Sequence, residues 1–450
     1  MVCVVAKKSG EKRGKVAYMG FLLSLCGVFF RNELAMNKHK IINDPVFGFL
    51  TLPSDRVYDV LQHPLVQRLS RIRQLGLSYY VYPGAQHSRF SHSLGAMHLM
   101  QEGLNMLRQK GVAISDEEHE SAQMAILLHD LGHGPFSHVL EHTLVQDITH
   151  EQVSRYMMEQ IDHDLATAEC PHPLGMAIAM FENTYPRRFF HRLLSSQLDV
   201  DRMDYLCRDS FFCGVQEGRV ASERLLKMLH VVGDHLVVEQ KGIYSVEKFL
   251  VARRLMYWQV YLHKTSVAAE QMLIKILSRA KQLAARGEAL FCSPALHYFL
   301  YQSVPAEAMY AGSEALTMYA LLDDSDVLSA IKAWMSHEDK VLATLCEMFV
   351  NRRLFRGTLR QEPVGRDEYE ALCTRYAEAL GVEKDDAHYF FVEHISTGNT
   401  YSEKADSIDI LYQDGQVKDI GEASEILDLK LLTYKPQKRY LFEARVGKNA

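Results

Sequence analysis

The sequence predicts a mainly α-helical fold with small β-hairpins and a small α+β region at the C-terminal end. From about Ser54 to Leu380, apolar residues recur mostly with the three-to-four-residue spacing of one helix face. Short runs of strand-forming residues flank turn residues near Asn43 and Gly233. After Ala387 the apolar residues alternate as they do in β-strands.

Length and composition limit the classes of protein that need to be considered. The chain has 450 residues, of which 48% are hydrophobic, so it is larger than one ordinary domain and can bury a substantial core. The net charge of −6 argues against a general nucleic-acid coat protein, which needs a basic face. A nucleic-acid partner is therefore not favoured, although a local basic pocket stays open as an alternative.

The cysteines and the N-terminal residues bear on the cellular compartment. The eight cysteines are scattered and form no Cys-x-x-Cys pair, which is typical of reduced thiols in a cytoplasmic protein. Residues 1–35 contain five lysines and arginines before the apolar run Tyr18 to Phe30, which is short for a membrane span. We expect either a disordered extension or a true start of translation at Met36. A membrane anchor is the alternative that is not favoured.

The first elements follow from turn residues and from apolar spacing. Residues 40–52 predict a short hairpin, since Asn43-Asp44-Pro45 and Gly48 are turn-forming. We then expect a helix that combines one apolar face with three arginines: Leu65, Leu69, Ile72 and Leu75, with Arg68, Arg71 and Arg73. Residues 79–84 interrupt the helical pattern as a loop, and the next helix is expected over 91–111.

The following helix has a clear N-terminal signal. Ser115 and Glu118 have the spacing of a capping box, and the helix is expected to continue to Asp130. Glycines and a proline at 132–135 end it, and another helix is expected to start near Ser137.

The rest of the chain reads as helices, a hairpin and a few strands. We expect a helix over 195–213, a hairpin over 231–238 and one or two helices over 245–290. Helical patterns continue to Leu380, with breaks at Pro305, Ser313 and Asp323-Asp324. Strands are expected over 388–395, 408–412, 417–420 and 439–444. These patterns suggest four segments: 1–35, a main domain over 36–290, a helical extension over 291–386 and a small α+β region over 387–450.

The stretch 126–138 places three histidines and an aspartate at the end of an apolar helix. Histidine is also concentrated around it, because eleven of the 21 histidines lie between His87 and His172. His129 and Asp130 can offer an imidazole nitrogen and a carboxylate oxygen to a divalent cation. Neighbouring side chains on a helix diverge by roughly 100°, so an ion would sit between them and take further ligands from other helices.

Two other segments can supply those ligands. His92 follows Arg89 at an expected helix start. Asp201 lies on an otherwise apolar helix and shares one face with Tyr205 and Asp209. Two histidines and two aspartates around one ion, with open positions for water and a phosphate oxygen, would form a hydrolytic metal centre. Such a set accepts Mn, Fe, Ni or Zn, with Mg as an added activator.

Several strings together identify a family. Residues 67–69, 73–76, 80–85, 89–95 and 129–138, followed by Asp201, resemble the HD phosphohydrolase superfamily and its deoxynucleoside triphosphate (dNTP) triphosphohydrolase, or dGTPase-like, branch. The resemblance covers about 40–264 and implies a helical HD core within 36–290. It also implies hydrolysis of a dNTP to a deoxynucleoside and inorganic triphosphate, with a nucleotide as the binding partner.

The resemblance assigns roles residue by residue. The implied metal ligands are His92, His129, Asp130 and Asp201, and the implied catalytic residues are His133 and His150. Positions near the triphosphate match Arg89, His138, Arg202 and Arg253. Positions around the sugar match Gln74, Leu75, Tyr205, Asp209 and Tyr261.

Some members of this family assemble as tetramers when a nucleotide binds between subunits, which implies a homo-oligomer, either a dimer or a tetramer. Lys40, Ile41, Asn43 and Gln67 match part of that regulatory site. Gln62 and Ser70 replace the aspartate and arginine that read guanine there, so activation by a guanine nucleotide is not implied.

The sequence leaves two alternatives to dNTP hydrolysis open. The first is an HD phosphohydrolase that acts on a nucleoside monophosphate or a guanosine alarmone. The second is a regulator with little turnover that senses nucleotides or binds nucleic acid.

Overall fold

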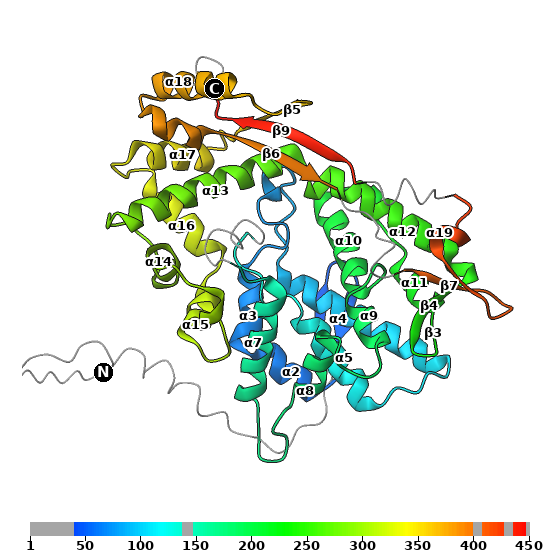
Figure 1. Cartoon of the computed structure of the whole chain (residues 1–450). Helices are drawn as coiled ribbons and strands as arrows, with labels where there is room; N and C mark the ends of the chain where they lie inside the picture. The colour runs from blue at the N-terminus through cyan, green and yellow to red at the C-terminus, as the bar shows by residue number, and fades with distance from the viewer. Residues whose placement is uncertain (1–39, 137–146, 399–406, 427–434, 447–450) are drawn as a thin grey trace, which may run out of the picture. The chain divides into compact units, whose positions relative to one another are not determined.

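Helices α4 (Arg89–Gln109) and α5 (Asp116–Leu128) lie at the centre of the fold, and α10 (Val200–Cys213) packs on α4 (Figure 1). The contact between α4 and α10 depends on a glycine. A Cβ atom at Gly95 would lie 1.9 Å from a carboxylate oxygen of Asp204 and 2.1 Å from Arg208. Only glycine therefore allows α10 to approach α4 this closely, which brings the acidic face of α10 next to His92.

The computed structural model describes residues 40–136, 147–398, 407–426 and 435–446. Ile41–Ala450 forms a unit of its own, separate from Met1–Lys40. The mainly helical fold class is confirmed, whereas the helix expected near Ser137 and the N-terminal apolar run lie outside the described residues. Among the described helices, none combines the length and the apolar character needed to cross a membrane.

The helices cover most of the chain. The other α-helices of the described residues are α2 (Asp55–Gln62), α3 (Pro64–Gln67), α7 (His150–Asp164), α8 (Gly175–Phe181), α9 (Phe189–Leu194), α11 (Ser222–Met228), α12 (Ile243–Met256), α13 (Lys264–Ala285), α14 (Pro294–Tyr301), α15 (Glu314–Leu321), α16 (Asp324–Trp334), α17 (Lys340–Val350), α18 (Arg366–Leu380) and α19 (Ile420–Ala423). Short helical turns are η2 (Arg68–Arg71), η3 (Ser78–Tyr80), η4 (Gln216–Gly218), η5 (Gln240–Gly242), the π-helical η6 (Tyr257–Tyr261), η7 (Ala306–Ala308) and η8 (Lys384–Phe390).

Several helix boundaries follow from capping side chains. The predicted capping box at Ser115 and Glu118 is confirmed, and α5 ends at Leu128 with His129 as its C-cap. Asp199 caps α10 by accepting a hydrogen bond from the backbone of Arg202. The helix predicted over 195–213 therefore begins later, at Val200. The segment 245–290 is two helices, α12 and α13, joined by the π-helical turn.

The predicted arginine-bearing helix is wrong in its second half. Helical structure ends at Arg71, and Arg73 instead pairs with Ser88 in an isolated β-bridge. The backbone N–H of Arg73 also donates to the Asp324 carboxylate at 3.1 Å. These partners lie far away in the sequence, so local helical spacing could not reveal them.

Nine short strands form three sheets within the described residues. They are β1 (Ile41–Asp44), β2 (Gly48–Thr51), β3 (Leu229–Val232), β4 (His235–Glu239), β5 (Arg356–Arg360), β6 (Phe391–Thr397), β7 (Asp409–Leu411), β8 (Val417–Asp419) and β9 (Gln437–Glu443). The hairpins β1–β2 and β3–β4 confirm the two predicted hairpins, and β7 and β8, which pair with each other, confirm two of the predicted strands.

The strand partners in the C-terminal region were not indicated by the sequence. The parallel pair β4–β7 joins two hairpins into the sheet β3-β4-β7-β8, and a second sheet has the order β5-β9-β6. The strand β5 lies in a stretch that the sequence predicts to be helical. The strands after Ala387 therefore pair with two separate earlier parts of the chain.

Candidate active site

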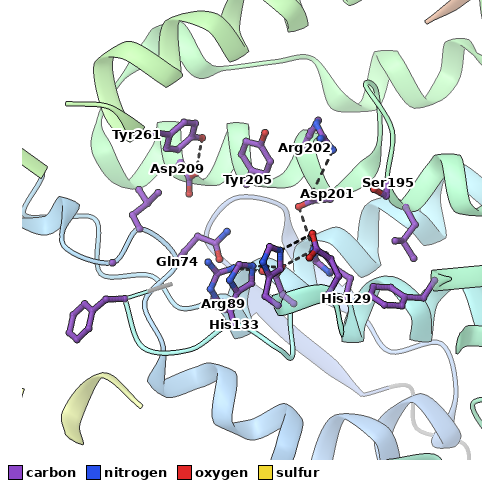
Figure 2. Close-up of a pocket in the computed structure, with 18 of the residues that line it drawn as sticks. Gln74, Arg89, His129, His133, Ser195, Asp201, Arg202, Tyr205, Asp209 and Tyr261 are labelled. Atoms are coloured by element: carbon purple, nitrogen blue, oxygen red, sulfur yellow. Dashed lines mark hydrogen bonds and ion pairs between the residues drawn. The ribbon is translucent and has the colours of Figure 1, made fainter. Parts of the chain in front are cut away.

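A pocket of about 840 Å³ opens between the end of α5, helix α10 and the turn between α12 and α13 (Figure 2). This volume is within the range of small-molecule sites. Twelve of the residues singled out in the sequence line it: Gln74, Leu75, Arg89, His129, Asp130, His133, His150, Asp201, Arg202, Tyr205, Asp209 and Tyr261.

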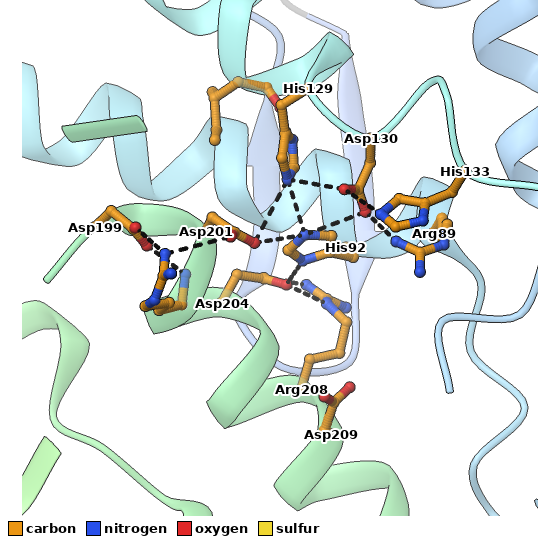
Figure 3. A network of polar contacts seen from close by, with 12 residues as sticks. Arg89, His92, His129, Asp130, His133, Asp199, Asp201, Asp204, Arg208 and Asp209 are labelled. Atoms are coloured by element: carbon orange, nitrogen blue, oxygen red, sulfur yellow. Dashed lines mark hydrogen bonds and ion pairs between the residues drawn. The ribbon is translucent and has the colours of Figure 1, made fainter. Parts of the chain in front are cut away.

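Four of the predicted residues meet at the base of this pocket (Figure 3). Ligand atoms of His92, His129 and Asp130 all lie within 4.8 Å of one another, and the two histidine Nε2 atoms are 3.4 Å apart. Asp201 Oδ1 lies 3.1 Å from Nε2 of His92 and 3.5 Å from Nε2 of His129. The structure therefore gathers two imidazoles and two carboxylates from α4, α10 and the end of α5.

The orientation of both imidazoles suits a metal ion. Nδ1 of His92 lies 2.6 Å from Asp204 Oδ2, and Nδ1 of His129 lies 2.6 Å from the Ile126 carbonyl oxygen. Because Nδ1 of each ring faces an acceptor, Nε2 is the atom that each ring can offer to a metal ion, which would displace the proton held there. Two such nitrogens beside two carboxylates fit a divalent cation.

Electrostatics supports the same conclusion. Burial disfavours the charged form of His92, but hydrogen bonds to Asp201 and Asp204 raise its pKa to about 10. The pKa of Asp201 is lowered in spite of burial, because His129 and His92 hydrogen-bond to it. The cluster is therefore a place of negative potential that attracts positive charge, either as protons or as a metal cation.

The two predicted catalytic histidines lie side by side at the edge of this cluster. The rings of His133 and His150 stack with centroids 4.0 Å apart, and His133 Nε2 lies 3.4 Å from Asp130 Oδ1. Burial, together with the nearby Arg89 charge, lowers the pKa of His133 to about 3. A Cβ at Gly132 would lie 2.0 Å from the His150 carbonyl oxygen, so glycine is needed for these segments to meet.

The opposite end of the pocket presents hydroxyl-binding groups. Asp209 accepts a hydrogen bond from the Tyr261 hydroxyl at 2.8 Å, and its other oxygen lies 2.8 Å from Nε2 of His87. Oε1 of Gln74 is buried and has no hydrogen-bond partner among the described residues. Leu75 and Tyr205 also line the pocket, and the ring centroid of Tyr205 lies 6.0 Å from that of Tyr261.

The predicted phosphate-binding residues differ in position. Arg89 lines the pocket and donates to Asp130 at 2.5 Å, and Arg202 lines it while pairing with Asp199. Arg253 is not among the lining residues; it is buried and donates to the side chain of Gln197 at 2.9 Å. His138 lies outside the described residues.

The residues matched to a regulatory site lie elsewhere. Ile41 and Asn43 are on β1, Lys40 directly precedes that strand, and Gln67 ends α3 and donates to the Leu61 carbonyl oxygen at 2.8 Å. None of these four lines the pocket. Their regulatory role therefore stays a prediction.

Three residues that support the site were not singled out from the sequence. Asp204 and Arg208 lie one turn apart on α10 and are completely buried, and Arg208 donates to both oxygens of Asp204 at 2.9 Å. The third is His87, which holds Asp209. The signal was present for the first two, since an acid and an arginine with i, i+4 spacing stand on an otherwise apolar helix.

Comparisons with known proteins agree with this geometry. The HD domain family matches residues 89–209, and the HD associated region matches residues 220–289. The uncharacterized protein YwfO of Bacillus subtilis is 33% identical over 403 residues, which cover 87% of this chain and 89% of YwfO. A solved phosphohydrolase from Bacteroides thetaiotaomicron is 51% identical with a TM-score of 0.87 and covers 91% of this chain and 100% of its own.

One group of relatives carries a named activity. The deoxynucleoside triphosphate triphosphohydrolase SAMHD1 homolog of Dictyostelium discoideum is 31% identical over 265 residues, covering 56% of this chain and 51% of its own length. The match to the HD domain family, over residues 89–209, includes the segments that hold the metal cluster. The chain belongs to the HD-domain phosphohydrolases.

Proposed function

We propose that the protein hydrolyses deoxynucleoside triphosphates to a deoxynucleoside and inorganic triphosphate, with one divalent metal ion bound by His92, His129, Asp130 and Asp201. The observation that supports this proposal is a single pocket with a metal-type cluster at its base and a hydroxyl-binding group, Asp209, at one end. The Dictyostelium relative is named for this activity.

The reaction requires one water and one broken bond. Water attacks the α-phosphorus, the bond between that phosphorus and the sugar 5′-oxygen breaks, and the 5′-oxygen leaves as a hydroxyl after taking a proton. When bound, the metal would polarise the phosphate oxygen and lower the pKa of the attacking water. The protein must hold the α-phosphate over the cluster and supply the proton.

Histidines and arginines of the pocket suit the remaining steps. His133 lies against Asp130 and next to His150, so this pair can pass a proton to the 5′-oxygen. His133 is neutral in the free protein, and the negative charge of a bound α-phosphate would favour its taking up that proton. Arg89 and Arg202 present guanidinium groups to a triphosphate, whose charge needs cations besides the metal. Both arginines already pair with aspartates, which holds them in place before the substrate arrives.

The sugar end supports a preference for a deoxy substrate. The carboxylate of Asp209 is in contact with Tyr261 and His87, one on each oxygen, and keeps lone pairs for a ligand hydroxyl. The unpartnered Oε1 of Gln74 offers a second acceptor to the 3′-hydroxyl. Leu75 and Tyr261 both line the pocket, and the family resemblance places them where they would crowd a ribose 2′-hydroxyl.

The test is product analysis with each of the four dNTPs and four rNTPs. Protein loaded with Mn²⁺ is incubated with each nucleotide, and triphosphate, pyrophosphate and phosphate are separated. We expect triphosphate from dNTPs, and in ¹⁸O-labelled water we expect the label in the triphosphate, because the α-phosphorus is attacked. Pyrophosphate with a monophosphate product would contradict the proposal.

The same experiment tests the alternatives. Nucleoside monophosphates and guanosine tetraphosphate are included as substrates, and turnover of these alone would indicate a different HD phosphohydrolase. Binding of nucleotide without turnover under any metal would indicate a sensing role. We also propose that the protein forms a homo-oligomer, a dimer or tetramer, and light scattering with and without nucleotide tests this.

A further inference from the structure

The loop that carries His133 is held by side chains from distant parts of the chain. Residues 131–136 follow the end of α5 and contain two glycines. The backbone carbonyl oxygens of Leu131, Gly132 and His133 all accept hydrogen bonds from the side chains of Arg68 and Tyr319. Two side chains from outside the loop therefore fix the orientation of three consecutive backbone carbonyl groups.

Arg68 is the larger part of this contact. Its side chain is completely buried, and one terminal nitrogen donates to the Leu131 oxygen at 3.1 Å and to the His133 oxygen at 2.9 Å. Its Nε donates to the Leu322 oxygen at 3.2 Å. Within the described residues it makes no ion pair with a carboxylate. Burying the guanidinium cation of Arg68 costs desolvation free energy. Its planar group of N–H donors, however, holds the carbonyl acceptors in a rigid arrangement.

Tyr319 of α15 lies under the guanidinium of Arg68. The guanidinium carbon is 5.1 Å from the centre of the Tyr319 ring. Its hydroxyl donates to the Gly132 oxygen at 2.9 Å. A Cβ at Gly134 would lie 2.8 Å from that hydroxyl, so the loop passes Tyr319 at the closest approach that glycine allows.

Asp324, the first residue of α16, completes the set. Its Oδ1 accepts the backbone N–H of Phe136 at 3.2 Å, and its Oδ2 accepts the backbone N–H of Arg73 at 3.1 Å. It therefore joins the end of the His133 loop to the strand-like residue just before Gln74. Both connected segments line the pocket, one beside the metal cluster and one beside the sugar end.

We propose that Arg68, Tyr319 and Asp324 are positioning residues that hold His133 in the position beside the metal cluster that proton transfer requires. The inference rests on the proposed function, because it acts through His133. It gives the helices α15 and α16, which lie beyond both matched family regions, a role in the chemistry. A side chain that moves a proton must be held within about 0.5 Å, which a glycine-containing loop does not ensure by itself.

Tyr319→Phe is the sharpest variant, because it removes one hydroxyl and keeps the ring beneath Arg68. Tyr301→Phe is a matched control, since the Tyr301 hydroxyl also donates to a backbone carbonyl, that of Glu288 at 2.7 Å, and Tyr301 does not line the pocket. We expect Tyr319→Phe to lower kcat for triphosphate release roughly tenfold or more, with KM and bound metal unchanged. Tyr301→Phe should leave kcat unchanged even if it lowers Tm equally.

A second measurement does not need activity. Hydrogen exchange followed by mass spectrometry should show faster exchange in peptides covering 126–136 for Tyr319→Phe and not for Tyr301→Phe. If the wild-type protein releases no triphosphate, the proposed function fails, while this comparison still tests whether Tyr319 holds the loop.

Asp324 provides a rescue test. Asp324→Asn keeps an oxygen that can accept from Phe136, so it should retain more kcat than Asp324→Ala at equal metal content. The inference is overturned if kcat of Tyr319→Phe stays within twofold of Tyr301→Phe. It is also overturned if Tyr319→Phe releases the metal, because the three residues would then act on the cluster and not on His133.

Discussion

Nδ1 of His92 lies 2.6 Å from Oδ2 of Asp204, a carboxylate that is completely buried on α10. Arg208 donates to both oxygens of this carboxylate and also to Asp44 on β1. This series of hydrogen bonds connects the first hairpin, helix α10 and the proposed metal ligand His92. It fixes the ring of His92 so that Nε2 faces His129.

Asp204→Asn should weaken metal binding while leaving the four proposed ligands in place. Partners that orient a metal-binding histidine typically contribute about 10–100-fold to affinity, and the amide lacks the charge that favours the Nδ1–H tautomer. Competition with a chelator measures the change. Asp209→Asn is the matched control on the same helix, and it should keep wild-type affinity; equal affinity in both variants would argue against the role of Asp204.

Asp201→Ala should abolish turnover and metal retention together. Asp201 is the one α10 carboxylate that approaches both histidine Nε2 atoms, at 3.1 and 3.5 Å. Adding Mn²⁺ to the metal-free wild type should raise Tm, because a ligand that binds only the folded state stabilises it. The variant should show no such rise, and full metal occupancy by elemental analysis would contradict the assignment of Asp201 as a ligand.

His87→Ala should reduce the preference for a 3′-hydroxyl. A hydrogen bond to a charged group contributes about 1.5–3 kcal/mol, so wild-type kcat/KM should be some tenfold or more higher for a dNTP than for its 2′,3′-dideoxy analogue. Without His87 to hold Asp209, the two values should approach each other, and Tyr261→Phe should act in the same direction. A general loss of stability would lower both values alike and leave their ratio unchanged, which would exclude this role.

Glu118→Gln should destabilise the protein in a pH-dependent way. Burial alone would raise the pKa of Glu118, but hydrogen bonds from the Ser115 amide, Arg187 and Tyr185 lower it below its ordinary value of 4.5. A carboxylate with a lowered folded-state pKa contributes stability above the unfolded value and loses it as the pH falls through the folded value.

The expected size follows from the loss of a charged acceptor. Glutamine keeps the capping geometry but not the charge, so the free energy of unfolding should fall by about 1–2 kcal/mol at pH 7. Urea unfolding of both proteins at pH 7, 5 and 4 measures the difference, which should be constant above about pH 4.5 and shrink below it. A difference that grows with acidity would contradict the assigned cause.

The sequence by itself determined the features that depend on neighbours along the chain. Helical spacing predicted the mainly α-helical fold, and Ser115 with Glu118 predicted a cap that the structure contains. The histidines and aspartates at His92, His129, Asp130 and Asp201 were sufficient to predict one cluster, and the structure brings them together.

Only the tertiary structure decided which distant groups meet. The helix bearing Arg68 ends at Arg71 because Asp324 and Ser88 take the backbone of Arg73, and neither is near in sequence. The pairing of β4 with β7, and the contact of Tyr319 with Gly132, likewise join segments more than 150 residues apart. Propensity and periodicity act over one or two turns, whereas these partners are selected by packing and by the need to satisfy buried polar groups. The sequence therefore predicted the cluster, and the fold supplied the residues that hold it.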